Sequence, residues 1–270
     1  MTTVNISAQT SFNSVLKGWR KRKKLSQLDL ALAAEVSQRH LSWLETGKSK
    51  PSREMVVRLA EALDVPLRDR NQILNLAGFA NLYSERDLTE PAMEPVQQIL
   101  QEILTHHEPY PAFVLDRNWN IKLKNDAAGI LFEALGDPEK VWRDVGDTGE
   151  MNIALLTVHP NGLRKFISNW HDVGPPFVRR LKKEALDSGN TALIEKSRRL
   201  QDLAGEPELI ESTHPDLLPV LPLEIDLGGP ILTLCSVIST FGTAQDITAN
   251  ELRIEAFYPA DEQTRRFFSE

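Results

Sequence analysis

Residues 25–66 read LSQLDLALAAEVSQRHLSWLETGKSKPSREMVVRLAEALDVP, and this stretch decides the fold of the first part of the chain. Ser26 and Ser37 are good helix N-caps, and each precedes apolar residues at helical spacing. The residues expected to face inward in these two helices are Leu28, Ala31, Leu32, Leu41 and Leu44. Glu35 and Val36 form a tight connection, and Gly47 is typical of a helix end. Two helices joined by so short a turn indicate a helix-turn-helix.

Three further helical patterns surround this pair and extend the predicted all-α region from Phe12 to Ala77. One precedes it, with Phe12, Leu16 and Trp19 on one face. Two follow it: one places Val56, Leu59, Ala60 and Leu63 on a stripe, and the other begins after Pro66. We therefore expect a five-helix domain over residues 1–80.

The second helix of a helix-turn-helix lies in the major groove of DNA, where its first turns contact base edges. The residues expected to contact bases are Gln38, Arg39, His40, Ser42 and Trp43. Gln38 and Arg39 are the leading base readers, because glutamine pairs with adenine and arginine with guanine. Trp43 suits packing or contact with a thymine methyl group. The residues expected to contact phosphates are Gln27, Ser37, Lys48, Lys50 and Arg53.

The quoted stretch resembles the Cro/C1-type repressor domain, also called the XRE family, over roughly residues 12–77. The positions that carry the resemblance are Ser26-Gln27, Leu30-Ala31, Val36-Ser37, Leu41, Leu44-Glu45, Gly47, Pro51, Leu59-Ala60 and Leu63. The resemblance implies an ion pair between Arg20 and Glu45 that is structural rather than a base contact. A five-helix domain that binds protein instead of DNA is the alternative.

Charge is distributed unevenly along the 270 residues. Residues 1–80 carry 13 Lys and Arg against 7 Asp and Glu, whereas the rest carries 18 against 31, so the two parts have net charges of +6 and −13. This asymmetry favours a nucleic-acid module joined to a domain of another kind. The single cysteine fits a reducing cytosol, and neither a secretory signal nor a membrane helix is recognisable, so we expect a cytoplasmic protein. The histidines lack metal-ligand spacing, and no cofactor or metal is expected.

After a linker over residues 81–94, residues 95–270 have the pattern of a second domain. An amphipathic helix carries Val96, Ile99, Leu100, Ile103 and Leu104, and it either packs on that domain or serves as a dimer or interdomain lever.

Two strands joined by a turn at 116–120 precede a helix over 127–135. Residues 151–204 look helical, with breaks at 159–160, 174–176 and Gly189. Strands return over 221–227, over 231–241 and over 252–258. The second of these is apolar or small on both faces, as expected of a central strand, and in the third Leu252, Ile254, Ala256 and Tyr258 are expected to face inward. This order predicts an α+β domain: an antiparallel sheet with helices on one face.

That order resembles a PAS-like sensor, and the segments PAFVLDRNWNIKLKNDAAGILF and NIALLTVHPNGLRKFISNW resemble the MmyB-like ligand-binding domain found behind repressor-type heads. The resemblance implies an apolar cavity for a small, fatty-acid-like ligand. The residues available to line it are Phe113, Leu115, Leu131, Phe166, Trp170, Leu223, Ile225 and Leu234, each of which also suits ordinary core. Arg164 and His214 are candidates for a carboxylate head group, with surface salt bridges or loops as alternative roles. Asn125 is a further site candidate, or it caps the helix that follows.

These observations predict a non-enzymatic transcription regulator that binds an operator as a homodimer and responds to an apolar ligand. One alternative is a constitutive DNA binder whose second domain only dimerises or recruits a protein. Another is a repressor that cleaves itself at Ala77-Gly78 or Ala204-Gly205, but no lysine follows Lys196 to activate a serine in the late strands.

Overall fold

A computed structural model describes residues 11–146, 149–205 and 219–269 of the chain. These residues form two compact units. The first contains residues 11–86 together with Thr243–Asn250, and the second contains Asp87–Gly242 and residues 251–269, apart from the gaps. Within the described residues, none of the helices has the length and apolar character needed to cross a membrane.

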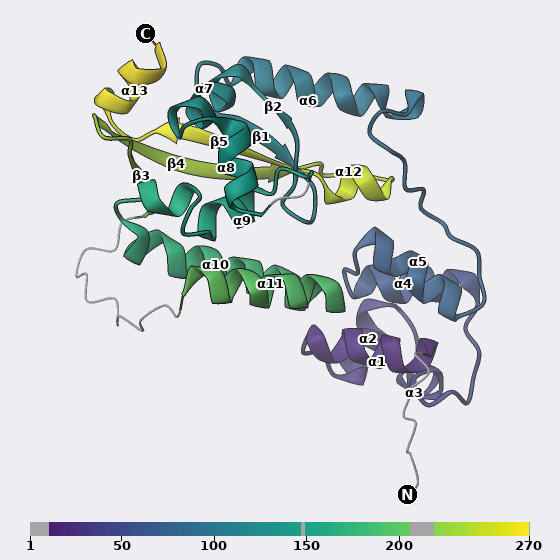
Figure 1. Ribbon diagram of the computed structural model, residues 1–270. Helices are drawn as coiled ribbons and strands as arrows, with labels where there is room; N and C mark the ends of the chain where they lie inside the picture. The colour runs from purple at the N-terminus through teal and green to yellow at the C-terminus, as the bar shows by residue number, and fades with distance from the viewer. Residues whose placement is uncertain (1–10, 147–148, 206–218, 270) are drawn as a thin grey trace, which may run out of the picture. The chain divides into compact units, whose positions relative to one another are not determined.

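The first unit contains the five helices that the sequence predicts (Figure 1). They are α1 (Phe12–Arg22), α2 (Gln27–Ala33), α3 (Gln38–Thr46), α4 (Arg53–Ala62) and α5 (Leu67–Leu76). A serine caps each of the first four and accepts a hydrogen bond from the backbone N–H three residues later: Ser11, Ser26, Ser37 and Ser52. Their inner faces form one core, which includes Leu16, Trp19, Leu41, Leu44 and Leu59.

The inward face of α2 differs from the prediction. Leu30 and Ala31 are buried, whereas Leu28 and Leu32 are 49% and 70% exposed. Leu28 and Leu32 are four residues apart and share one side of the helix, so a helix that buries Leu30, Ala31 and Ala34 must turn that side outward. When nearly every residue of a helix is apolar, the sequence predicts that the helix forms but not which of its sides faces the core.

The second unit is built on a five-stranded antiparallel sheet in the order β2-β1-β5-β4-β3, which confirms the predicted α+β, PAS-like domain. The strands are β1 (Ala112–Leu115), β2 (Ile121–Lys124), β3 (Leu223–Asp226), β4 (Ile231–Thr240) and β5 (Arg253–Pro259). The last strand, β5, is inserted between the first hairpin and β4, and it brings the two ends of the domain together.

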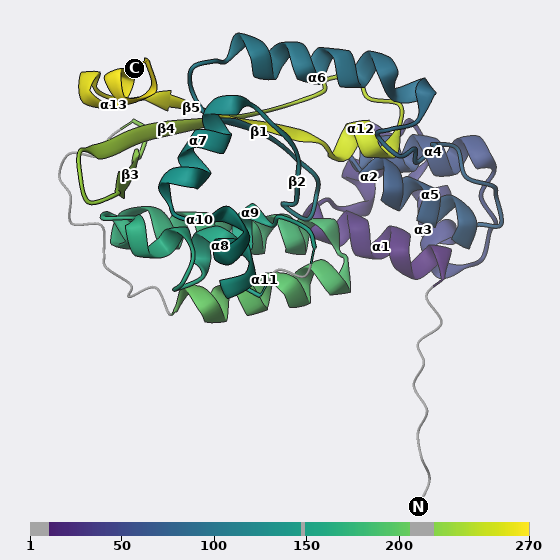
Figure 2. The ribbon, with the colours of Figure 1, turned by 45° about the horizontal axis from the view of Figure 1, so that its top comes forward.

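Helices cover both faces of this sheet, not one as predicted (Figures 1 and 2). On one face, Leu100 and Leu104 of α6 (Glu94–His106) pack with Ala112, Val114, Leu252 and Ile254. This packing is one of the two roles expected of that helix, although Ile99 and Ile103 remain 46% and 36% exposed. The other face carries a larger core, to which α7 (Asp126–Ala134), α9 (Ile153–Val158), α10 (Trp170–Ser188) and α11 (Thr191–Ala204) contribute. The remaining elements are η1 (Pro91–Met93), α8 (Pro138–Asp144), η2 (Leu163–Phe166), α12 (Ile247–Glu251) and α13 (Glu262–Ser269).

One further prediction is corrected by the structure. Helix α10 continues through Pro175 and Pro176, where a break was expected. The prolines remove two backbone donors in the second turn, and the burial of Val178, Leu181 and Ala185 along the same helix offsets this loss. Strand β4 is interior in the sheet, as predicted, although Val237 on it is 54% exposed.

Residues 82–86, which follow the five helices, are held within the first unit by a series of polar contacts. Buried Asn71 of α5 accepts hydrogen bonds from the N–H groups of Leu82 and Tyr83 and donates to the Tyr83 carbonyl oxygen. Ser84 and Asp246 form an isolated parallel β-bridge through their backbones, and the Arg86 guanidinium forms an ion pair with the Asp246 carboxylate at 2.9 Å. The segment Thr243–Asn250, which connects β4 to β5 in the sequence, is thereby attached to residues 84–86.

Candidate nucleic-acid interface and ligand cavity

The turn between α2 and α3 is fixed by backbone geometry. Glu35 adopts a positive φ of 53°, and the Val36 N–H donates to the Ala31 carbonyl oxygen at 2.8 Å. At the far end of α3, Gly47 caps the helix with φ 74°. This positive φ favours glycine, and a Cβ atom there would lie 2.5 Å from Nδ2 of Asn13, so the end of that side chain would have to move. The serine cap and the glycine cap therefore define the two ends of α3.

A buried ion pair ties α1 to α3. Arg20 Nε and Nη2 donate to the two carboxylate oxygens of Glu45 at 2.6 and 2.9 Å, and Arg20 Nη1 donates to the Leu25 carbonyl oxygen. The Glu45 side chain is 1% exposed. Its burial raises the pKa, but hydrogen bonds from Arg20 and Gln27 and the charge of Arg20 outweigh that effect, so the pKa of Glu45 lies below its usual value. These are the residues that the family resemblance pairs, and the geometry is that of a structural contact.

The residues proposed to read bases lie along α3 with different exposures. Gln38 and Arg39, in its first turn, are exposed, whereas His40 and Ser42 are half-buried. The Arg39 guanidinium lies over the ring of Trp43, with 4.6 Å between Cζ and the ring centroid. Because Trp43 is 39% exposed, this contact holds Arg39 above the helix surface without enclosing it.

The residues proposed to contact phosphates lie at the two ends of α3 and at the start of α2. Lys48, Lys50 and Arg53 are exposed after Gly47. Ser37 Oγ accepts a hydrogen bond from the N–H of His40. The Gln27 side-chain amide donates to Glu45 at 2.8 Å, so a phosphate contact at Gln27 rests on its backbone N–H in the first turn of α2.

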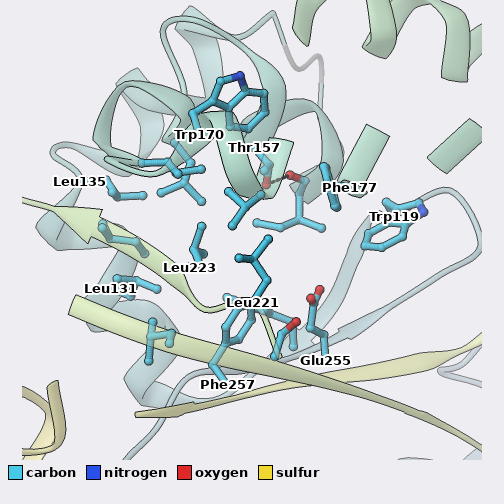
Figure 3. A pocket seen from close by; sticks show the side chains of 18 of the residues that line it. Trp119, Leu131, Leu135, Thr157, Trp170, Phe177, Leu221, Leu223, Glu255 and Phe257 are labelled. Atoms are coloured by element: carbon cyan, nitrogen blue, oxygen red, sulfur yellow. Dashed lines mark hydrogen bonds between the residues drawn. The ribbon is translucent and has the colours of Figure 1, made fainter. Parts of the chain in front are cut away.

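In the second unit, a cavity of about 210 Å³ lies between the sheet and the helices (Figure 3). Strands β1, β3, β4 and β5 form one wall, and α7, α9 and α10 supply side chains opposite. Of the lining residues that the structure describes, only Thr157, Ser236 and Glu255 have polar side-chain groups apart from the indole nitrogens. The remaining lining residues are Phe113, Trp119, Leu131, Phe132, Leu135, Ile153, Leu163, Ile167, Trp170, Val173, Pro176, Phe177, Leu221, Leu223, Ile225, Leu234 and Phe257.

The cavity collects most of the apolar residues that the sequence proposes for it: Phe113, Leu131, Trp170, Leu223, Ile225 and Leu234. Leu115 and Phe166 belong to the same core but do not line the cavity.

The two polar candidates that the structure describes, Asn125 and Arg164, do not line the cavity. Asn125 caps α7 and binds the backbone of Tyr110 and Ala112. Arg164 donates to the Leu203 carbonyl oxygen and stacks on Trp170. His214 is outside the described residues.

Sequence reasoning missed several lining residues, and among them Glu255 is the one with a carboxyl group. Alternation along the last strand suggested that Leu252, Ile254, Ala256 and Tyr258 face the core and that the charged residues between them face solvent. In the structure, Ile254 and Leu252 pack against α6, whereas Glu255 and Phe257 face the cavity. The error follows from expecting helices on one face only, because with both faces covered the polar side of β5 is buried as well.

A group of charged residues lies beside Glu255. Glu184 of α10 accepts hydrogen bonds from Arg180 at 2.8 Å, from Arg253 at 2.7 Å and from the indole of Trp119 at 3.2 Å. Both arginines also lie over the Trp119 ring, at 5.3 and 4.7 Å from its centroid. Glu184 therefore neutralises part of their charge and orients Trp119 at the edge of the cavity.

Comparisons with known proteins agree with this architecture. Residues 16–69 match a family model described as a helix-turn-helix. Residues 96–270 match the model described as the MmyB-like transcription regulator ligand binding domain. None of the curated proteins compared matches the chain.

Proposed function

Because the chain belongs to the MmyB-like family of transcription regulators by a match over residues 96–270, we propose that it regulates transcription in response to a small apolar, fatty-acid-like ligand. A DNA-binding helix-turn-helix and a ligand-binding domain are the parts that the family matches establish. The nature of the ligand is our inference. The observation that carries it is the cavity, whose walls are almost entirely aliphatic and aromatic.

The size of the cavity limits the ligand. Its volume of about 210 Å³ exceeds the roughly 150 Å³ of an engineered cavity that accepts benzene and is below the roughly 300 Å³ at which pockets for drug-sized molecules begin. A medium-length acyl chain or a small ring system fits this range. An acyl chain also matches the apolar walls along its whole length.

Native mass spectrometry of the full chain with saturated fatty acids of 6–16 carbons tests this proposal. We expect one ligand per chain, with the strongest binding at intermediate length. Leu223→Trp fills the cavity and should abolish the adduct, whereas Leu186→Trp, at an exposed position of α10, adds the same ring elsewhere and should not. Absence of any adduct with the wild-type chain contradicts the proposal, as does unchanged binding by Leu223→Trp.

For the five-helix domain of residues 12–76, called the head below, the proposed activity is recognition of an operator by a homodimer in the cytoplasm. Two-fold symmetry places the half-sites about one helical turn apart. A ligand can change operator affinity only if it favours one arrangement of the regulator over another. Operator binding measured with and without the ligand separates this reading from a constitutive DNA binder, for which the two affinities are equal. Two fragments on incubation of the pure chain would instead indicate a self-cleaving repressor.

A further inference from the structure

Among the cavity-lining residues that the structure describes, Glu255 is the one that carries a carboxyl group, on a wall that is otherwise mostly apolar (Figure 3). Glu255 lies in the middle of the sheet, where its neighbours across the strands are Phe113 on β1 and Ile238 on β4. Glu255 as a whole is 9% exposed to solvent. Ser236, on the neighbouring strand β4, also lines the cavity. A polar group is thus held at a defined place on an apolar wall.

The surroundings of Glu255 favour the neutral carboxylic acid. Burial raises its pKa, and the charge of Glu184 adds to that effect; Arg180, the Ser236 hydrogen bond and Arg253 oppose it without reversing it. Both arginines also bind the Glu184 carboxylate, so part of their positive charge is neutralised there. A neutral carboxyl group has an O–H donor and a carbonyl acceptor, so it can pair with an uncharged oxygen or amide group.

We propose that Glu255 anchors the polar end of the ligand, and that the cavity selects amphiphiles with an uncharged hydrogen-bonding head group, such as an alcohol or an amide, over carboxylates. This inference rests on the proposed ligand-binding function. A carboxylate placed beside Glu255 would bring a second acidic group into an apolar space, where at least one of the two must hold a proton. A fatty acid is then bound as its uncharged acid and takes up a proton on binding.

Four probes with the same ten-carbon tail test the head-group preference: decane, 1-decanol, decanoate and decylamine. Binding to the full chain is measured by calorimetry and by the fluorescence of the lining tryptophans. At pH 7.5 we expect 1-decanol to bind about tenfold more tightly than decane, the effect of one buried hydrogen bond. Decanoate should weaken about tenfold for each pH unit above roughly 5, because its acid form becomes rarer.

Three variants separate an anchoring role from a structural one. Glu255→Gln keeps a donor and an acceptor and should keep the preference for 1-decanol over decane within about threefold. Glu255→Leu should abolish that preference while leaving decane binding intact, and Glu255→Met replaces it if the leucine variant does not fold. Thr157→Val is the matched control: Thr157 also lines the cavity, but its hydroxyl donates to the Ile153 carbonyl oxygen, so the preference should remain.

The outcomes distinguish this inference from the proposed function. If no probe binds the wild-type chain, both fail. Equal affinity for decane and 1-decanol, or a preference that survives Glu255→Leu, overturns the anchoring role alone. Tightest binding by decylamine overturns it as well, since Glu255 would then act as a charged counter-ion. Tightest binding by decanoate without proton uptake places an anionic head group in the cavity and also contradicts the proposal.

Discussion

At the scale of single residues, we propose different roles in DNA binding for Arg39 and Lys50. Arg39 is exposed in the first turn of α3 and positioned over Trp43, whereas Lys50 is exposed in the loop after Gly47. Arg39→Ala should cost about 1–3 kcal/mol at one base position and relax specificity there. Lys50→Ala should weaken all sequences alike and reduce the slope of log affinity against log salt by about one unit.

Operator variants and salt titrations measure both effects. An equal loss at every sequence for Arg39→Ala would assign that residue to the phosphate backbone. His40→Ala is a useful comparison, because His40 lies on the same turn but is half-buried.

The Arg20–Glu45 pair is expected to control the stability of the head. Glu45→Ala leaves a buried guanidinium without its carboxylate and should cost about 3–5 kcal/mol of unfolding free energy. Lys23→Met is the control: Lys23 pairs with Asp64 at 3.2 Å, but the Asp64 side chain is 93% exposed, so the loss should stay below about 1 kcal/mol. Hydrogen exchange of the α1 and α3 backbone amides in the full chain measures the stability loss in both variants. Similar protection in the two variants would show that the buried pair contributes no more than a surface pair.

The same pair predicts how stability changes with pH. The pKa of Glu45 is lower in the folded head than its ordinary value of 4.5. Its contribution is therefore complete above about pH 4.5 and is lost as the pH falls through the lower folded value. Glu45→Gln should flatten this acid-side loss in the α3 amides. An unchanged acid profile would assign the loss to other carboxylates.

At the scale of elements, Gly47 and Gly18 make a matched pair with opposite expectations. Gly47→Ala should destabilise the five-helix domain by about 1 kcal/mol, because φ is positive and the end of the Asn13 side chain must move away from the new Cβ. Gly18 lies inside α1 with open space around its Cβ position, so Gly18→Ala should stabilise by up to about 1 kcal/mol. Thermal unfolding of the two variants tests whether Gly47→Ala lowers the stability and Gly18→Ala raises it. Stabilisation by Gly47→Ala would contradict the assigned cap geometry.

The elements also show which parts of the structure the sequence could predict. All five head helices were predictable because serine caps, the Gly47 stop and apolar spacing are local signals. The rotation of α2 was not, because Leu28, Leu30, Ala31 and Leu32 offer two apolar faces and only the neighbouring helices choose between them.

The same reasoning applies to the cavity. Phe113, Leu131 and Trp170 were predictable because large apolar residues in a sensor-like domain end on its inner wall. Glu255 was not, because its orientation depends on α6 covering the opposite face of the sheet, and alternation within β5 does not reveal a second covered face.

At the scale of the whole molecule, the proposed response to ligand requires a connection between the cavity and the DNA-binding helices. The chain leaves β4, passes through Thr243–Asn250 and enters β5, which carries Glu255 and Phe257 on the cavity wall. The Ile247 N–H donates to the Ser84 carbonyl oxygen at 2.8 Å, and Thr248 Oγ1 donates to that of Arg86 at 2.6 Å. Residues 82 and 83 in turn bind Asn71 of α5. We therefore propose that a displacement of β5 on ligand binding is transmitted along the chain to Thr243–Asn250, and from there through these backbone and side-chain hydrogen bonds to α5.

Loosening this path should reduce the effect of ligand without reducing its binding. Arg86→Met removes the ion pair with Asp246, and Thr248→Val removes the hydroxyl that binds the Arg86 carbonyl oxygen. In the double variant, we expect ligand affinity to stay within about twofold, while the ligand-dependent change in operator affinity falls to less than half of its wild-type free energy, which is about 1–3 kcal/mol for typical allosteric couplings. Arg265→Met is the control, since Arg265 lies on α13 and pairs there with Glu262. Calorimetry gives the ligand affinity and fluorescence anisotropy the operator affinity; an unchanged coupling in the double variant would exclude residues 84–86 as the route.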